Sequence, residues 1–305
     1  MGSTHSYQQD PRNADIKISI NGELFHRDKA MVSVFDSGFI LGDGIWEGLR
    51  MHRGVIPFLE KHMQRLWEGA LALDLELCLS KEELKQRLYD TLDANGMDDN
   101  VHIRLMVSRG IKATPYQDPA MTIGGPTIVI IPEYKNPDVA LNDRGINLYT
   151  VYVRRGYADV QDPRINSHSK LNCIFACIQA SKAGADEALM LDPHGHVATC
   201  NSTHFFIVRD GEVWTSSGDY CLDGITRRNV IDLCKANGIP VFEKNFSVMQ
   251  AYGAQEAFVT GTFAGLTPVF DIDGRRIGEG TRGPMVDRLQ GLYREMISAH
   301  CSAGR

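Results

Sequence analysis

The alternation of apolar and polar residues along the chain predicts strands first. Residues 16–20 alternate, Asn21-Gly22 is a strong signal for a two-residue hairpin turn, and residues 23–25 continue the pattern. The pattern predicts a β-hairpin near the N-terminus, preceded by a polar, mobile tail over residues 1–13. Apolar runs predict further strands at residues 101–108, 127–131, 146–153, 187–191, 204–208 and 257–260.

Apolar residues at helical spacing predict helices between these strands. Residues 59–73 place Met63, Leu66 and Ala70 on one face of a helix. Ser80 is followed three residues later by Glu83, the pattern of a capping box, which predicts a helix start at that point. Three more helices are predicted at residues 171–183, 227–237 and 284–300.

A polar stretch rich in proline and asparagine divides the chain into two halves. We interpret residues 135–145 as an interdomain linker, because turn-forming residues gather there between two strand patterns. The predicted domains are therefore residues 14–134 and 146–305. Both halves mix strands with helices, so the fold class expected is α+β.

Composition and charge exclude several classes of protein. Hydrophobic residues make up 43% and charged residues 23% of the chain, which is ordinary globular composition. The net charge of −6 argues against a nucleic-acid partner or an anionic membrane surface. No apolar run approaches the roughly 18–20 residues of a membrane helix, and the polar N-terminus lacks the apolar core of a secretory signal. Seven cysteines without a CxxC pair exclude a zinc ribbon, and they indicate a reducing, cytoplasmic setting without a metal site.

Three features carry candidate chemistry. Gly224-Ile225-Thr226-Arg227 opens a predicted helix, whose first backbone N–H groups suit an anion. Thr260-Gly261-Thr262 ends an apolar strand, and its hydroxyls could make a second set of contacts to a phosphate. Lys170 precedes a helix, and a lysine in an apolar site can serve as a nucleophilic amine. Two anion-binding sites and one amine suggest pyridoxal phosphate. Taken singly, each feature is also an ordinary helix start, turn or surface lysine.

The order and spacing of several motifs together resemble one family. The chain is similar to class IV aminotransferases, the fold-type IV pyridoxal-phosphate family of branched-chain and D-amino-acid aminotransferases, (R)-selective amine transaminases and aminodeoxychorismate lyase. The resemblance covers residues 16–296 and implies a small N-terminal α/β domain and a larger C-terminal domain with a mixed, β-barrel-like sheet and helices. The motifs are VFDSGF at 34–39, LGDGIWEG at 41–48, HMQRL at 62–66, AGADEA at 183–188, GITR at 224–227, TGT at 260–262 and TPV at 267–269.

The resemblance also implies roles for individual residues. The residues that match cofactor-phosphate contacts in the family are Arg65, Ile225, Thr226, Gly261 and Thr262. Trp46 resembles the aromatic residue that lines the substrate pocket, and Arg50 lies near it in the sequence.

One departure from the family concerns the lysine that holds the cofactor. In relatives this lysine directly follows the Asp-Pro-Arg-Ile motif, but here Asn166 follows it, and the nearest lysine is Lys170. Asparagine cannot form an imine with an aldehyde. Our hypothesis is that the lysine has moved to position 170, where relatives often carry an aromatic residue. The alternative is a catalytically impaired, cofactor-binding relative with Lys170 on its surface.

A second departure lies at Thr199, where relatives place a glutamate against the pyridine nitrogen of the cofactor. A threonine hydroxyl can hydrogen-bond this nitrogen but holds a proton there less firmly. Transamination remains possible with such a partner, at a lower rate. The alternative is a hairpin residue that does not contact the cofactor.

The function that these features favour is a pyridoxal-phosphate-dependent aminotransferase. It would move an amino group from an amino acid or primary amine to a 2-oxo acid or ketone through a Schiff base on Lys170, working as a homodimer. The arginine-x-histidine carboxylate trap of D-amino-acid members is missing, although Arg109 and Lys112 could engage a carboxylate. An aminodeoxychorismate-type lyase on the same fold is the alternative enzyme, which releases pyruvate without an oxo acceptor.

Overall fold

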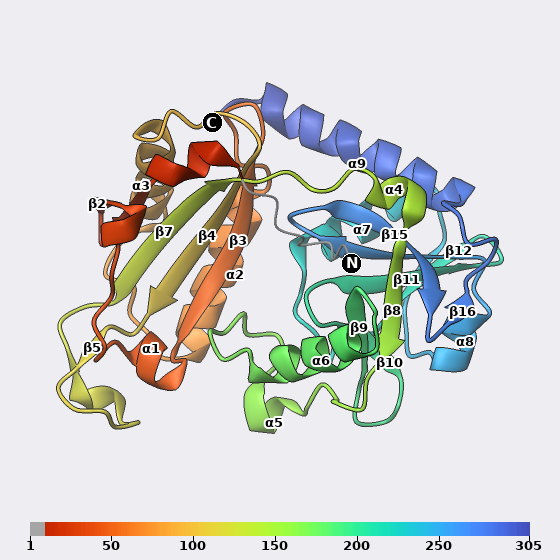
Figure 1. Ribbon diagram of the computed structural model, residues 1–305, viewed down its shortest axis with the longest axis horizontal. Coiled ribbons are helices and arrows are strands. Elements are labelled where there is room, and N and C mark those ends of the chain that lie inside the picture. Colours follow the sequence, from red (N-terminus) through yellow and green to blue (C-terminus); the bar gives the residue numbers. More distant parts are fainter. Residues whose placement is uncertain (1–9) are drawn as a thin grey trace. The chain divides into compact units, whose positions relative to one another are not determined.

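The chain folds into two compact units, shown as a ribbon in Figure 1. This computed structural model describes residues 10–305. The N-terminal unit comprises residues 10–136, 165–169 and 299–305, and the C-terminal unit comprises residues 137–164 and 170–298. Most of the predicted tail lies outside the described residues. The prediction of a mobile tail was wrong for residues 11–13, because they belong to η1 (Pro11–Asp15), a 3-10 helix that Asp10 caps through its side chain.

The sheet of the N-terminal unit is antiparallel throughout, with the order β2-β1-β7-β4-β3. Asn21 and Gly22 both have positive φ angles, as a two-residue hairpin turn requires, so the predicted β-hairpin is confirmed. The predicted capping box of Ser80 and Glu83 is also confirmed, at the start of α3. The strands are β1 (Lys17–Ile20), β2 (Glu23–His26), β3 (Gly44–Met51), β4 (Val101–Ser108) and β7 (Thr127–Tyr134), and the main helices are α2 (Leu59–Ala72) and α3 (Lys81–Asp93).

The core of the N-terminal unit fixes which way the side chains of β3 point. Leu49 of β3 lies in one buried cluster with Met63 of α2 and Leu84 of α3. Successive side chains of a strand point to opposite faces of the sheet. Glu47 therefore lies on the helix-covered face, whereas Trp46 and Arg50 lie on the other.

The C-terminal unit is built on a nine-stranded mixed sheet, with the order β10-β9-β8-β15-β14-β11-β12-β13 and β16 beside β15. β8 pairs in parallel with both β9 and β15, whereas β14 pairs antiparallel with β11 and β15. The strands are β8 (Ile146–Thr150), β9 (Glu187–Leu191), β10 (Val197–Cys200), β11 (His204–Arg209), β12 (Glu212–Thr215), β13 (Val241–Glu243), β14 (Glu256–Gly261), β15 (Gly265–Ile272) and β16 (Arg275–Arg276).

Two helices of this unit matter for the site. α6 (Leu171–Lys182) packs on β9, and α7 (Ile225–Ala236) packs on β14. Both units combine helices with sheets, so the predicted α+β class is confirmed. The remaining elements are η2 (Arg27–Lys29), α1 (Ser37–Leu41), β5 (Ile111–Lys112), η3 (Pro119–Met121), β6 (Thr122–Ile123), α4 (Leu141–Arg144), α5 (Ala158–Gln161), α8 (Val248–Tyr252) and α9 (Pro284–Ser302).

The unit boundaries differ from the sequence-based domains in two places. The predicted linker at 135–145 contains α4, which packs on β15 in the C-terminal unit. Residues 165–169 group with the N-terminal unit, because Ser167 forms an antiparallel bridge with Ile45 of β3. Local sequence patterns do not encode this pairing between distant segments.

Candidate active site

Lys170 stands at the start of α6 in the C-terminal unit. It is the N-cap residue of the helix and is half-buried, rather than exposed like an ordinary surface lysine. Its own side chain does not cap the helix.

Asn166, at the position where the family resemblance places a lysine, is buried and bonded to the backbone of β3. Its Nδ2 donates to the carbonyl of Trp46 at 2.6 Å, and the backbone N–H of Trp46 donates to the carbonyl of Asn166 at 3.0 Å. The side chain therefore ties residues 165–169 to the edge of β3. An amide held in this way has a structural role and supplies no amine.

Candidate phosphate contacts gather at the start of α7. Ile225 and Thr226 are buried in its first turn, and the N-cap residue Gly224 offers no side chain to bond the first backbone N–H groups. α7 packs on β14, where the buried Thr260 hydroxyl has no hydrogen-bond partner in the part of the chain that the structure describes. An unpaired buried hydroxyl and an uncapped helix start are donors that fit a phosphate. Thr262, just beyond β14, is half-buried.

Thr199 is buried on β10, and its hydroxyl proton is already used. Its Oγ1 donates to the carbonyl of Thr203 at 2.9 Å, and the Thr203 hydroxyl donates to Glu187 at 2.7 Å. A hydroxyl has one proton and two lone pairs. An incoming ring nitrogen would therefore meet an acceptor at Thr199, and it would need to carry a proton to bond there.

Trp46 and Arg50 share one face of β3, as their spacing requires. The guanidinium carbon of Arg104 lies 4.1 Å from the centre of a Trp46 ring, and the indole N–H of Trp46 donates to the carbonyl of Ser167 at 3.2 Å. Arg50 is buried at 8% exposure. This face of the sheet thus presents an aromatic ring with the Arg104 guanidinium against it, and Arg50 lies on the same face.

Arg65 belongs to a buried network that runs from α2 to β3. Its Nε and Nη2 bond the two carboxylate oxygens of Glu47 at 2.8 and 2.6 Å, and Nδ1 of His62 lies 2.7 Å from Glu47 Oε2. Burial opposes ionisation of Glu47, but Arg65 and His62 outweigh it and lower the pKa of Glu47 to about 2. Burial also lowers the pKa of His62, whose Nδ1 lies within hydrogen-bond distance of Glu47 Oε2. The network fixes the orientation of the Arg65 guanidinium.

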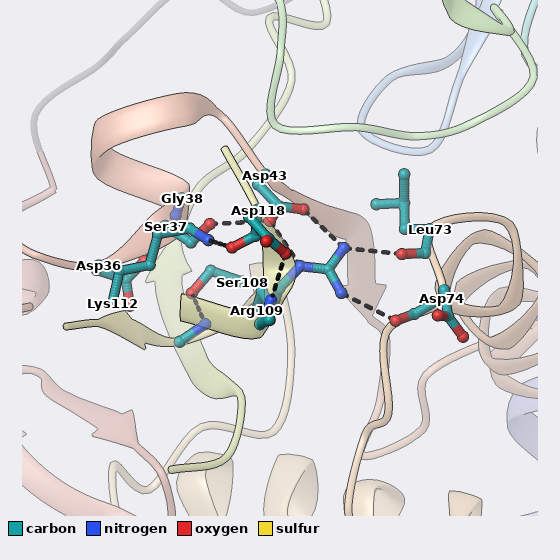
Figure 2. Close-up of polar contacts among 12 residues, drawn as sticks. Asp36, Ser37, Gly38, Asp43, Leu73, Asp74, Ser108, Arg109, Lys112 and Asp118 are labelled. Carbon is teal, nitrogen blue, oxygen red and sulfur yellow. Dashed lines mark hydrogen bonds and ion pairs between the residues drawn. The ribbon is translucent and has the colours of Figure 1, made fainter. Parts of the chain in front are cut away.

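Arg109 and Lys112, candidates for a substrate carboxylate, are bonded within the N-terminal unit (Figure 2). Arg109 bonds both oxygens of Asp43, at 2.7 and 3.1 Å, and also the carbonyls of Leu73 and Asp74 at the end of α2. Lys112 is 1% exposed, and its ammonium donates to the carbonyl of Asp118 at 3.0 Å. Arg109 therefore ties the end of α2 to the loop before β3.

Three residues missed in the sequence analysis lie in polar networks of the structure, Glu47 and His62 in the N-terminal unit and Arg155 in the C-terminal unit. Glu47 and His62 stand in quoted motifs, and their spacing from Arg65 becomes informative only when β3 packs beside α2. Arg155 follows the strand β8 as the second of two arginines, a signal that alone also fits a solvated pair.

Two further findings concern metals and membranes. Among residues 10–305, no cluster of three or more His, Cys, Asp and Glu side chains is arranged to hold a metal ion. Within the same residues, every helix is too short or too polar to cross a bilayer.

Comparison with known proteins gives consistent matches. The family profile described as Amino-transferase class IV matches residues 44–272. The chain is 41% identical over 286 residues to branched-chain-amino-acid aminotransferase-like protein 2 of Arabidopsis thaliana, covering 94% of this chain and 51% of that protein. It is 31% identical to a branched-chain-amino-acid aminotransferase of Pseudomonas aeruginosa, covering 94% of each.

The fold matches solved structures as well. A crystal structure of the T.th. branched-chain amino acid aminotransferase with pyridoxamine 5'-phosphate superposes with a TM-score of 0.87 at 31% identity, covering 94% of this chain and 95% of that one. This likeness confirms the predicted architecture. The chain spans about half the length of the Arabidopsis relative, so that protein has further sequence that this chain does not match.

Proposed function

The chain belongs to the class IV aminotransferase family, and from this premise we propose that it is a pyridoxal-phosphate-dependent aminotransferase. Its substrates are an amino acid or primary amine as donor and a 2-oxo acid or ketone as acceptor. The observation that carries the proposal is the donor set of the C-terminal unit, where Lys170 accompanies the uncapped start of α7 and the unpaired Thr260 hydroxyl. The pyridoxamine 5'-phosphate in the T.th. crystal structure supports the choice of cofactor.

Each residue of the proposed site has its own role. Pyridoxal phosphate, when bound, supplies an aldehyde that reacts with amino groups and a ring that withdraws electrons from the bond being broken. The Lys170 amine would hold the cofactor and would act as the general base that takes up and returns the substrate proton. Thr199 would accept a hydrogen bond from a protonated ring nitrogen, because its own proton is donated to the carbonyl of Thr203. The phosphate contacts are Arg65, Ile225, Thr226, Gly261 and Thr262, and the substrate contacts are Trp46 and Arg50. Lys112 is not one of them, because it is buried and its ammonium donates to the carbonyl of Asp118.

Borohydride reduction of protein loaded with pyridoxal phosphate, followed by peptide mapping, tests the proposal. We expect a phosphopyridoxyl group on Lys170, none in Lys170→Ala, and an undiminished yield in Lys182→Ala, a matched change of an exposed lysine on the same helix. A group on another lysine would refute the role of Lys170. Bound cofactor without an adduct would identify a cofactor-binding relative.

We also propose that the protein is a homodimer. In the C-terminal unit, α6 exposes large apolar side chains, with Leu171 62% and Phe175 54% exposed. The N-terminal unit exposes Met31, Val34 and Phe39. Exposed apolar groups of this size mark an interaction surface. Light scattering should give a dimer for the natural sequence and a monomer for Phe175→Glu, and a monomeric, fully active natural protein would contradict the proposal.

The cytoplasm is the proposed location. All seven cysteines lie in the described residues, and all are free thiols. Free thiols persist in reducing compartments. Fractionation of the source cells should place the protein with the cytosolic markers, and recovery in an oxidising compartment would refute this.

A further inference from the structure

Arg155 lies five residues beyond the end of β8 and is bonded to the sheet of the C-terminal unit. Its backbone N–H donates to the carbonyl of Leu191, at the end of β9, at 2.9 Å. The side chain is half-buried, and among residues 10–305 it has no carboxylate partner. A partly buried guanidinium that is not neutralised by an acid must be held by other acceptors.

The acceptors of Arg155 come from three separate segments. Nη1 lies 3.0 Å from Oδ1 of Asn172 and 3.5 Å from Sγ of Cys173, both in the first turn of α6. Nη2 donates to the carbonyl of Pro163 at 3.4 Å, and Nε donates to the carbonyl of Tyr220 at 3.3 Å. One rigid, planar group thereby joins these segments to the loop after β8 and, through the backbone of Arg155, to the end of β9.

These contacts lie on both sides of Lys170. Residues 165–169 belong to the N-terminal unit, and Pro163 precedes them while Asn172 follows them. Asn172 makes a second link, because its Nδ2 donates to the carbonyl of Arg154 at 2.9 Å. The backbone before and after Lys170 is thus held to the same short segment, Arg154 and Arg155.

We propose that Arg155 is a positioning residue that sets where the Lys170 amine lies. This inference rests on the proposed function only for the role of the amine. A lysine side chain has four rotatable bonds, so its backbone must be fixed for its amine to be placed. Lys170 does not cap α6 with its side chain, and the Arg155 contacts to Asn172 and Cys173 hold the first turn of the helix through its side chains. A misplacement of about 1 Å costs on the order of a hundredfold in rate.

The experiment compares four variants. Arg155→Gln removes the guanidinium and its charge, and Arg155→Lys keeps the charge with one nitrogen in place of three. Asn172→Ala removes one acceptor of Arg155 together with the bond from Asn172 Nδ2 to the Arg154 carbonyl. Arg154→Gln is the matched control, since the exposed Arg154 contributes only its backbone carbonyl to these contacts.

Two readouts are needed, one with the cofactor and one without it. The first is the yield of borohydride-trapped adduct on Lys170, which we expect to fall about tenfold in Arg155→Gln and less in Arg155→Lys and Asn172→Ala. The second is amide hydrogen exchange over residues 174–177, the first amides that are hydrogen-bonded within α6, in cofactor-free protein, expected about tenfold faster in Arg155→Gln. Arg154→Gln should match the natural protein in both.

The outcomes separate the two proposals. An adduct elsewhere in the natural protein would refute the role of Lys170, while the exchange rates would still decide whether Arg155 holds α6. An adduct on Lys170 with unchanged yield and exchange in Arg155→Gln would overturn the positioning role. If Arg155→Gln does not fold, Asn172→Ala decides in its place, and natural yield and exchange in that variant overturn the inference.

Discussion

Replacing Glu47 by glutamine removes one charge from the buried network of the N-terminal unit. Glu47 is fully buried, and it bonds Arg65 twice and His62 once. Glutamine has the same shape and can still bond one of these partners, but it leaves the Arg65 charge without its carboxylate. The change therefore tests how strongly the ionised carboxylate stabilises the fold.

The size of the effect follows from the pKa of Glu47. Its pKa falls from 4.5 to about 2 on folding. At about 1.4 kcal/mol per pKa unit, ionised Glu47 contributes about 3 kcal/mol to the free energy of unfolding at pH 7. We expect Glu47→Gln to lose an amount of this order.

The pH dependence has a definite sign. Because the folded pKa lies below the unfolded one, the contribution of Glu47 is complete above pH 4.5 and declines as the pH falls towards 2. The gap in stability between the natural protein and Glu47→Gln should shrink by about 1 kcal/mol between pH 7 and about pH 3.5. The lowered pKa of His62 also costs stability below pH 6.5, since the unfolded chain takes up that proton first, but both proteins contain this histidine.

Urea denaturation measures the effect, with fluorescence of Trp46 and Trp67 reporting on the N-terminal unit. Glu82→Gln is the matched control, because Glu82 is 79% exposed in its pair with Lys85 and should change stability by less than about 1 kcal/mol. A loss in Glu47→Gln no larger than in this control would refute the reasoning. A gap that stays constant down to pH 3.5 would refute the assigned pKa.

Three further predictions concern other parts of the chain. Asp43→Asn removes the carboxylate that bonds Arg109, and a loss of about 2 kcal/mol is expected in urea denaturation; unchanged stability would contradict the structural role of Arg109. The exposed Cys78 and Cys177 should react first with a thiol reagent at pH 8, whereas Cys200, whose pKa burial raises, should react only on unfolding; equal rates would contradict this burial. Gly224→Ala places a Cβ 2.2 Å from Nε2 of His204. The free energy of unfolding should therefore fall by about 1–3 kcal/mol, and inorganic phosphate should bind more weakly. An unchanged free energy of unfolding together with unchanged phosphate affinity would refute the packing at the start of α7.

Local signals made a large part of the fold predictable. The positive-φ turn at Asn21-Gly22 and the Ser80 capping box each act over a few residues, so the sequence encodes them directly. Periodic apolar residues located β4 and α2 in the same way.

The polar networks could not be predicted, because their partners lie far apart in the sequence. Asn166 is separated by 120 residues from Trp46, and Arg109 by 66 residues from Asp43. Arg109 and Lys112 look like available cations in the sequence, and only the packed structure shows what they bond. The role of Lys170 stays a prediction, since the family resemblance places the lysine elsewhere.

The division of the chain into units limits how it can be cut. The described chain passes from one unit to the other at four places, after residues 136, 164, 169 and 298. A fragment ending at residue 136 would lack Asn166, which bonds the backbone of β3 at Trp46. It would also lack Arg305, which pairs with Asp93. Neither unit is therefore a module that can be expressed by a single truncation. Synthesis must reach Arg305, beyond the end of α9, before the N-terminal unit has all the contacts described, so its folding is completed only after that helix has emerged from the ribosome.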